Sequence, residues 1–254
     1  MSWWEVLLLA LVEGVTEFLP ISSTGHLILL STWLGRAHEA FVQDYEIIIQ
    51  GGAILAVVVY SHRRLWQPRM YGLVAAAFLP TATIGFFAKD FLETLLSSPL
   101  VVAINLILGG LVLLSMDRWF KSASGGIEAL PVWRAGVIGL VQSLSLFPGV
   151  SRAAAALFGA RWMGLRKEDA AEFSFLLAVP TLGAASAYKL YKSSATFEGA
   201  HLLALGVGIG VSFLVALLSM RFLVGLWQRY GMQPFGVYRI VLGAIVLLWL
   251  SFFS

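Results

Sequence analysis

Residues 13–26 read EGVTEFLPISSTGH, and this polar stretch lies between two runs whose composition is that of membrane-buried sequence. It holds the carboxylates Glu13 and Glu17, a run of hydroxyl residues at 22–24 and the imidazole of His26. A charged side chain in the middle of a bilayer costs about 2.5–3.5 kcal/mol even on the mildest insertion scales, so such residues are candidates for function. We therefore interpret this stretch as one half of an active site.

The composition of the chain is that of an integral membrane protein. Of its 254 residues, 59% are hydrophobic and 12% are charged, against roughly 25% charged residues in soluble domains. The apolar segments are too long and too uniform for barrel strands, which predicts an all-α protein. We expect one membrane domain over 1–254, with no separate soluble domain.

Three further features of the composition exclude other classes. The first residues lack the basic flank and cleavage site of a signal peptide, so we expect them to remain in the mature protein. The chain has no cysteine, which excludes disulfides and thiolate metal sites. The net charge of +3 gives no sign of a nucleic-acid partner.

Six apolar stretches are long enough to cross a bilayer, near 42–60, 71–89, 99–117, 170–190, 201–220 and 235–253. Four shorter runs, at 3–13, 24–35, 135–147 and 153–163, have about half the required length. They form two pairs, each interrupted by a short polar break that contains a proline, and the second break reads PGVSR at 148–152. The sequence therefore predicts six transmembrane helices plus two re-entrant pairs of half-helices.

The two broken pairs resemble each other. A shift of 129 positions gives six identities: Leu11/Leu140, Val12/Val141, Phe18/Phe147, Ser22/Ser151, Trp33/Trp162 and Gly35/Gly164. Each half then consists of one broken pair followed by three spans, over about 1–118 and about 131–254. An odd number of spans in each half requires the two pairs to enter from opposite faces, so we predict an inverted-topology repeat.

The placement of basic residues agrees with this topology. The cytoplasmic side would hold Arg63, Arg64, Arg69, Arg118, Lys121, Arg134, Arg161, Arg166, Lys167, Arg221, Arg229 and Arg239. The opposite side would hold only Arg36, Lys89, Lys189 and Lys192. This asymmetry satisfies the positive-inside rule and predicts that both termini lie outside.

The residues of the first break suit chemistry on an anion. Glu13 and Glu17 lie four apart, on one face of a helix, where they are available for acid–base work or for a hard metal ion. The alternative is a pair that caps a buried polar junction. His26 is able to act as base, acid or nucleophile, or it makes only an interhelical hydrogen bond.

The start of each second half-helix predicts a phosphate site. Ser22, Ser23, Thr24 and Gly25 open one half-helix, and free N–H groups at such a terminus favour anions; an ordinary N-cap is the alternative. Arg152 opens the other half-helix, and a guanidinium there suits phosphoryl groups. Its alternative is an ion pair with Glu13 or Glu17. For four weaker candidates we favour structural contacts: Glu46, Gln50, Gln142 and Glu172. The polar residues of the two breaks are therefore compatible with phosphate chemistry and with anion transport.

The motifs themselves resemble those of a known family. Residues 13–26 resemble the first signature of the bacterial undecaprenyl-diphosphate phosphatase family, the bacitracin-resistance type. Residues 148–152 resemble the second signature, and AEFSFLLAVP at 171–180 also resembles the family. The similarity runs over essentially the whole chain, and the first motif is long and specific.

The resemblance implies hydrolysis of undecaprenyl diphosphate to undecaprenyl phosphate and inorganic phosphate, recycling the carrier lipid for peptidoglycan synthesis and conferring bacitracin resistance. It implies a multi-pass protein of the bacterial cytoplasmic (inner) membrane, a site that faces the periplasm and a divalent cation, Mg²⁺ or Ca²⁺. The implied roles are a metal-binding acidic pair, Glu13 and Glu17; the favoured nucleophile, Ser23; an acid–base residue or rival nucleophile, His26; and a phosphate clamp, Arg152. Ser22, Thr24, Gly25 and Ser151 would complete the phosphate site.

One departure from the family concerns the second break. In the family, the arginine of the second signature is usually followed by Ser-Gly-Ala-Thr. In this chain Arg152 is followed by Ala153, Ala154, Ala155 and Ala156. The second half-helix thus offers Arg152 and backbone N–H groups without the extra hydroxyls. We expect the first break to carry nearly all of the side-chain chemistry.

Our working hypothesis has the lipid tail entering between helices and Ser23, activated through His26, attacking the terminal phosphorus; attack by His26 or by water stays open. The rival class is a carrier-lipid flippase or ion-coupled transporter, because broken helices in an inverted repeat are typical of transporters. A homo-oligomer also stays open.

Overall fold

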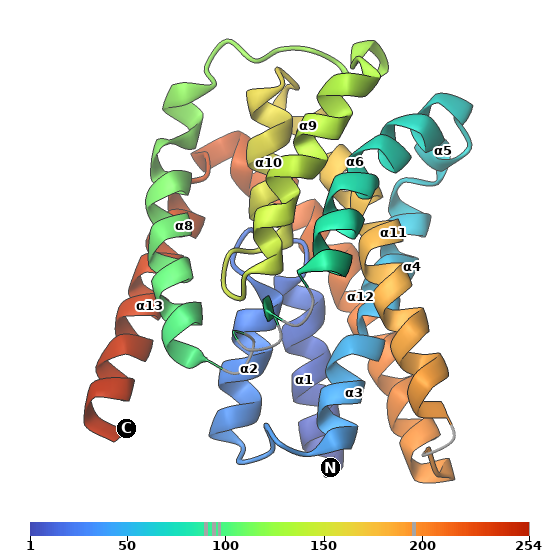
Figure 1. Ribbon diagram of the computed structural model, residues 1–254, viewed down its shortest axis with the longest axis vertical. Helices are drawn as coiled ribbons and strands as arrows, with labels where there is room; N and C mark the ends of the chain where they lie inside the picture. The colour runs from blue at the N-terminus through green and yellow to red at the C-terminus, as the bar shows by residue number, and fades with distance from the viewer. Residues whose placement is uncertain (89–90, 93–94, 96–97, 195–196, 254) are drawn as a thin grey trace.

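The computed structural model describes residues 1–88, 91–92, 95, 98–194 and 197–253, and these form helices joined by short turns (Figure 1). The helices in order are α1 Trp3–Thr16, α2 Ser23–Trp33, α3 Ala40–Ile48, α4 Gln50–Tyr60, α5 His62–Leu65, α6 Pro68–Phe87, α8 Pro99–Trp119, α9 Val132–Gln142, α10 Arg152–Trp162, α11 Lys167–Ser193, α12 Gly199–Tyr230 and α13 Gln233–Phe253. Two short 3₁₀ helices, Ile127–Ala129 and Ser143–Leu146, flank α9.

The prediction of an all-α protein with six membrane-crossing helices is confirmed. The six candidate spans are Ala40–Tyr60, Pro68–Phe87, Pro99–Trp119, Lys167–Ser193, Gly199–Tyr230 and Gln233–Phe252. The first of them combines α3 and α4, which meet at Ile49. Lys89, at the end of the span expected at 71–89, lies outside the described residues. The chain is thus a helical, multi-pass membrane protein.

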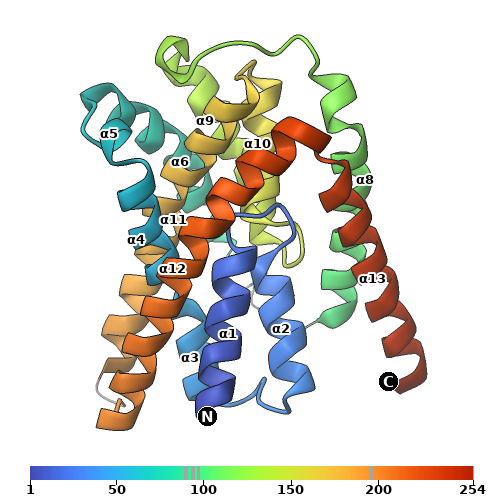
Figure 2. The ribbon, with the colours of Figure 1, turned by 180° about the vertical axis from the view of Figure 1, so that it is seen from behind.

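The short helices lie in two groups within the molecule. In both ribbon views α1 and α2 lie in the half that carries the chain termini, and α9 and α10 lie in the opposite half (Figures 1 and 2). The turn between α1 and α2 approaches the turn before α10 near mid-height. Residues more than a hundred positions apart in the sequence therefore meet inside the protein.

The two breaks have matching backbone conformations. Ser22 and Ser151, the residues before α2 and α10, have φ of 74° and 77°, a region that non-glycine residues adopt at a cost of about 1–3 kcal/mol. Each hydroxyl accepts a hydrogen bond at 3.2 Å from the backbone N–H three residues later, on Gly25 or Ala154. The agreement supports the internal repeat, which stays a prediction.

Small residues allow the helices to approach closely. A Cβ atom added to Gly139 on α9 would lie 1.8 Å from the carbonyl oxygen of Ala77 on α6. A Cβ atom on Gly14 of α1 would lie 2.8 Å from Cβ of Val215 on α12. Since lipid tails are as apolar as the helices, such close backbone packing is a main source of helix association in membranes.

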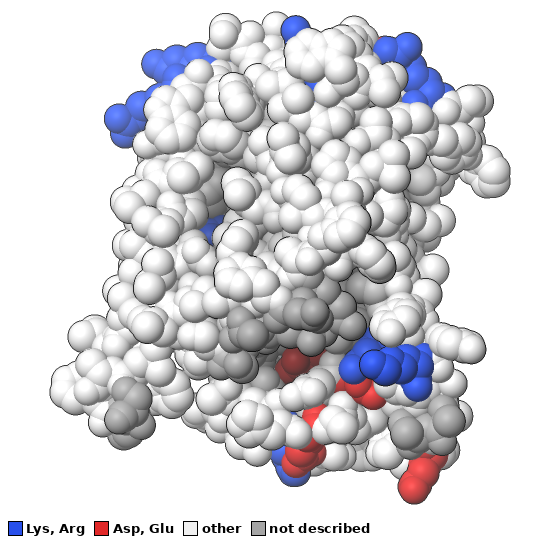
Figure 3. Space-filling model, viewed as in Figure 1, with Lys and Arg blue, Asp and Glu red and all other residues white. Residues whose placement is uncertain are grey.

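Charged side chains of the described residues follow the predicted asymmetry, and Arg239 is an exception. Lys and Arg gather at the end opposite the termini, and few charged residues lie along the sides (Figure 3). The placement of Arg239 on the cytoplasmic side was wrong, because its side chain is fully buried and contacts both breaks. A count of charges along the sequence does not reveal that buried carbonyl groups can bind a guanidinium.

Candidate active site

A cavity of about 600 Å³ lies where the two breaks meet. Its polar lining comes from both breaks, from α4, α6 and α11, and from α9 and the 3₁₀ helix after it: Glu17, Ser22, Ser23, Thr24, Gln50, Thr81, Gln142, Ser145, Ser151, Arg152 and Thr181. Its apolar lining includes Phe78, Leu92, Leu146, Phe147 and Leu182. The cavity is therefore suited to a molecule with a charged head and a hydrocarbon tail.

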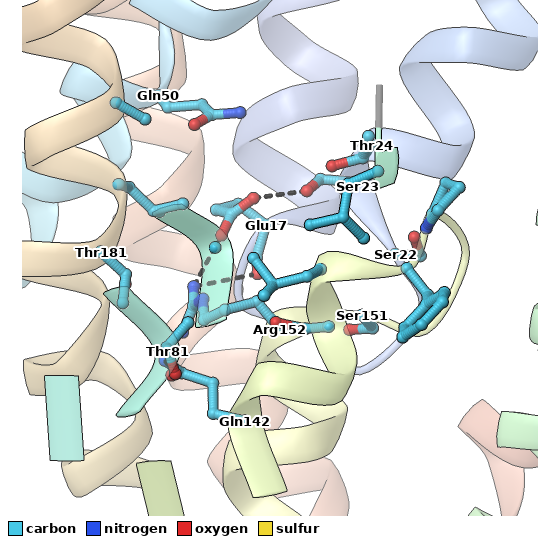
Figure 4. A pocket seen from close by; sticks show the side chains of 18 of the residues that line it. Glu17, Ser22, Ser23, Thr24, Gln50, Thr81, Gln142, Ser151, Arg152 and Thr181 are labelled. Carbon is cyan, nitrogen blue, oxygen red and sulfur yellow. Dashed lines mark hydrogen bonds and ion pairs between the residues drawn. The ribbon is translucent and has the colours of Figure 1, made fainter. Parts of the chain in front are cut away.

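Glu17 and Ser23 form the first contact of the site (Figure 4). Helix α1 ends at Thr16 and Pro20 has no N–H to continue it, so the chain turns before α2 begins at Ser23. This turn brings the Ser23 hydroxyl to the Glu17 carboxylate, to which it donates a hydrogen bond. Both residues are less than a tenth exposed. A carboxylate that accepts a hydroxyl proton in this way is placed as a general base.

Arg152 reaches the same carboxylate from the second break. Its Nη2 donates to Oε1 of Glu17 at 2.6 Å (Figure 4). Its Nη1 donates to the Ser174 carbonyl oxygen at 3.0 Å. The guanidinium also lies 5.5 Å above the ring of Phe18. Its Nε has no hydrogen-bond partner among the described residues. The ion pair that the sequence left open is therefore present.

The serines before the half-helices serve as N-caps and also line the cavity. Ser22 and Ser151 each accept a backbone hydrogen bond, which is the alternative we considered for the first break. Thr24 lines the cavity, whereas Gly25 does not. The first N–H groups of α2 and α10 have no intrahelical acceptor, so they are available to an anion in the cavity.

His26 lies outside the set of residues that line the cavity. Its Nδ1 contacts the carbonyl oxygen of Ser22 at 2.7 Å, and its Nε2 contacts the hydroxyl of Tyr238 on α13 at 2.7 Å. The two rings are nearly parallel, with centroids 5.6 Å apart. The interhelical contact that the sequence left open is therefore present, and Glu17 rather than His26 adjoins the Ser23 hydroxyl.

Glu13 lies one turn before Glu17 and is fully buried outside the cavity lining. Neither of its carboxylate oxygens has a hydrogen-bond partner among the described residues. Those residues include no group of three or more His, Cys, Asp and Glu side chains placed to hold a metal. A cation at Glu13 and Glu17 would thus need further ligands of another kind, such as hydroxyl, carbonyl, water or phosphate oxygens.

The weaker candidates separate by location. Gln50 and Gln142 line the cavity, and Nε2 of Gln142 donates to Thr81 at 3.2 Å. Glu172 pairs with Arg64 at 3.3 Å in another part of the structure, in agreement with a structural role. Glu46 is outside the lining, and its Oε1 has no partner among the described residues.

Sequence reasoning missed five polar residues that line the cavity or bond to Arg152 and His26: Thr81, Ser145, Ser174, Thr181 and Tyr238. The two threonines directly follow Pro80 and Pro180, which lie inside α6 and α11. A Pro-Thr pair in a long apolar helix was therefore the available signal. Ser174 lies in the segment at 171–180 that resembles the family, whereas Ser145 and Tyr238 carried no comparable signal.

Comparison with known proteins gives similarity along nearly the whole chain. The family described as "Bacitracin resistance protein BacA" matches residues 6–245. A protein of Bdellovibrio bacteriovorus named undecaprenyl-diphosphatase is 44% identical over 98% of this chain and 97% of its own length. A protein of Aquifex aeolicus with the same name is 41% identical over 96% and 97%. Undecaprenyl-diphosphatase 2 of Paramagnetospirillum magneticum is 45% identical over 95% and 97%.

Proposed function

This chain belongs to the bacitracin resistance protein BacA family, and we propose that it hydrolyses undecaprenyl diphosphate to undecaprenyl phosphate and inorganic phosphate. The names of its relatives support this reaction. The observation that carries the proposal is the contact of Glu17 with both Ser23 and Arg152 in one cavity. The reaction would return the carrier lipid to peptidoglycan synthesis and confer resistance to bacitracin.

The first step is attack by the Ser23 hydroxyl on the terminal phosphorus. An Oγ–P bond forms, the bond to the bridging oxygen breaks, and the lipid monophosphate leaves with that electron pair. Glu17 takes the hydroxyl proton and passes it to the leaving oxygen. The Arg152 guanidinium and the N–H groups that open α2 and α10 would stabilise the charge on the transferred group.

The second step is attack of water on phosphoserine. Glu17 takes a proton from the water as the new P–O bond forms, and the Ser23 oxygen leaves and recovers a proton. The net reaction adds one water across the diphosphate. We assign His26 to holding α2 through Tyr238, while attack by His26 or directly by water remains as an alternative. Trapping and mapping a phosphorylated residue distinguishes these three routes.

We propose that the reaction uses a divalent cation, Mg²⁺ or Ca²⁺. Glu13 has two buried oxygens without partners among the described residues, and Glu17 lies one helical turn away. Hard cations take carboxylate oxygens, and Mg²⁺ commonly completes its shell with water and phosphate. Glu13 and Glu17 would hold the ion, which supplies neutralising charge at the diphosphate when bound.

The membrane itself is part of the proposed reaction. The apolar lining from α6, α11 and the second break would accept the first part of the lipid tail, which enters sideways between helices. The proposed location is the bacterial cytoplasmic (inner) membrane with the site open to the periplasm or outside. The excess of basic residues at the end opposite the termini supports this orientation.

Phosphate release by the purified protein in detergent tests the proposal, because no transport is possible there. We expect release from the lipid diphosphate by the wild type and a severe loss in Ser23→Ala. Full turnover by Ser23→Ala would exclude the serine route, and absence of release by the wild type would exclude the hydrolase. The flippase alternative finds no support in the names of the relatives.

A further inference from the structure

Arg239 on α13 is fully buried and donates hydrogen bonds to five backbone carbonyl groups. The acceptors and their distances are Pro20 at 3.1 Å in the first break; Gly149 at 2.8 Å and Val150 at 2.9 Å in the second break; and Asn105 at 2.9 Å and Leu106 at 3.3 Å on α8. One side chain thus joins both breaks to the pair α8 and α13, which lie side by side in both views (Figures 1 and 2).

Helix α8 is shaped to admit this side chain. A Cβ atom on Gly109 would lie 2.2 Å from Nη2 of Arg239, so any larger residue there would displace the guanidinium. Asn105, one turn earlier, donates through Nδ2 to the carbonyl of Pro148 at 2.8 Å. The second break is therefore held by α8 directly and by Arg239 across it.

The bonds to Arg239 also orient the peptide groups of the second break. In a planar trans peptide the C=O and the following N–H point in opposite directions. Because the Val150 carbonyl points at Arg239, the N–H of Ser151 points away from it. Ser151 lines the cavity and has a φ of 77°, a conformation that persists only where the surroundings impose it.

The charge of Arg239 has no ion-pair partner among the described residues. Its printed contacts are all carbonyl oxygens. A buried charge without a counter-ion is costly, and a diphosphate between the two breaks would bring the opposite charge close to it. The five hydrogen bonds alone would explain why Arg239 can be buried. The positive charge without a counter-ion, close to the proposed phosphate site, is a separate observation.

We propose that Arg239 is a positioning residue for phosphoryl transfer. It holds the two breaks at the separation at which Ser23 and Arg152 both reach Glu17, and it adds positive charge behind the phosphate site. The kinetic test of this proposal rests on the proposed function, because it measures phosphate release. The second test measures a distance within the protein and does not rest on that function.

Arg161 supplies a matched control. It is also buried, and it donates to the carbonyl groups of Ala123 and Leu165, each at 2.8 Å, outside the cavity lining. We compare Arg239→Met, Arg239→Lys and Arg161→Met for thermal stability and for kcat and KM with a polyprenyl diphosphate. Both Met variants should lose stability. Only Arg239→Met should lose kcat, by about 100-fold, since a misplacement near 1 Å has an effect of that order.

Arg239→Lys keeps the charge and loses most of the bonds, so we expect it to recover part of kcat. If Arg239→Met does not fold, the result for Arg239→Lys decides. A tenfold or greater loss of kcat in Arg239→Lys, with the melting temperature of the wild type retained, supports the proposal. A kcat equal to that of the wild type overturns it. Equal loss of kcat per folded protein in Arg239→Met and Arg161→Met also overturns it.

The second test does not depend on activity. The chain has no native cysteine, so spin labels at Trp33→Cys on α2 and Leu140→Cys on α9, both exposed positions, report the separation of the two half-helix pairs. The distance should shift or broaden with Arg239→Met or Arg239→Lys and stay unchanged with Arg161→Met. An unchanged distance in the Arg239 variants would overturn the proposal. If the labels move but the wild type releases no phosphate, the proposed function fails and the positioning role stands.

Discussion

Arg152 donates to Glu17 at 2.6 Å although the two residues are 135 positions apart in the chain. Each oxygen of the Glu17 carboxylate is engaged, Oε1 by Arg152 and Oε2 by Ser23. The carboxylate thus connects the residue proposed to attack with the residue proposed to hold the phosphate. Variants of these three residues should show related defects.

Replacing Glu17 with Gln should abolish most of the activity. The amide keeps the size of the side chain but cannot take the proton of Ser23, and general-base catalysis contributes about 10²–10⁴-fold. We expect a loss of kcat in this range for phosphate release. Glu172→Gln, which changes a carboxylate paired with Arg64 away from the cavity, is the control and should retain activity. Wild-type kcat in Glu17→Gln would contradict the assignment of the base.

Replacing Arg152 with Lys should be far from conservative. A single ammonium cannot reach Glu17, Ser174 and a phosphate oxygen together, as a guanidinium can. We expect kcat/KM to fall about 10²–10³-fold, the effect of losing one preorganised donor at an oxyanion. The exposed Arg134, which bonds the Met163 carbonyl, supplies the control Arg134→Lys. Equal activity of the two variants would argue against the clamp.

Removal of divalent cations should stop phosphate release. Activity lost in a chelator should return with Mg²⁺ or Ca²⁺, and Glu13→Gln should raise the cation concentration needed for half-maximal rescue by about 10–100-fold. Glu39→Gln, a partly exposed carboxylate paired with Arg36, should leave this concentration unchanged. Full activity in chelator would remove the metal from the mechanism.

His26 and Tyr238 should act as one unit. Since they contact each other and His26 lies outside the cavity lining, His26→Ala and Tyr238→Phe should each lower kcat by about tenfold or less. The double variant should add little to the larger single effect. Activity in His26→Ala as low as in Ser23→Ala would instead place His26 in the chemistry. Tyr188→Phe, at an exposed tyrosine, controls for loss of a hydroxyl.

Gly139→Ala should destabilise the packing of α9 against α6. The new Cβ atom would lie 1.8 Å from the Ala77 carbonyl, so α6 and α9 must separate. Overpacking of this kind costs about 1–3 kcal/mol, which a thermal unfolding measurement in detergent detects. The control is Gly72→Ala on α6. A Cβ atom at Gly72 would have no atom within 4 Å, so this variant should not lower the melting temperature. Equal melting temperatures of the two variants would contradict the close contact.

Hydropathy and composition were sufficient for the fold class, because a bilayer requires apolar helices of a minimum length and leaves few other solutions. Five of the six spans therefore agreed with expectation within a few residues at each end, whereas the span expected at 201–220 continues ten residues further, to Tyr230. The position of Arg239 could not be predicted in this way. Its burial depends on five carbonyl groups from three separate segments, whose convergence no local pattern records.

The candidate site divides in the same manner. The sequence alone determined that Glu13, Glu17, Ser23, His26 and Arg152 are polar residues in membrane-buried surroundings, since apolar flanks and a proline identify each break. Only the tertiary structure decided that Ser23 faces Glu17, that Arg152 completes this contact and that His26 faces Tyr238. The reason is that each helix can rotate about its own axis. The spacing of residues in the sequence shows which of them share a face of a helix. The direction in which that face points follows from the turn at each break and from the packing of α2 and α10 against their neighbours.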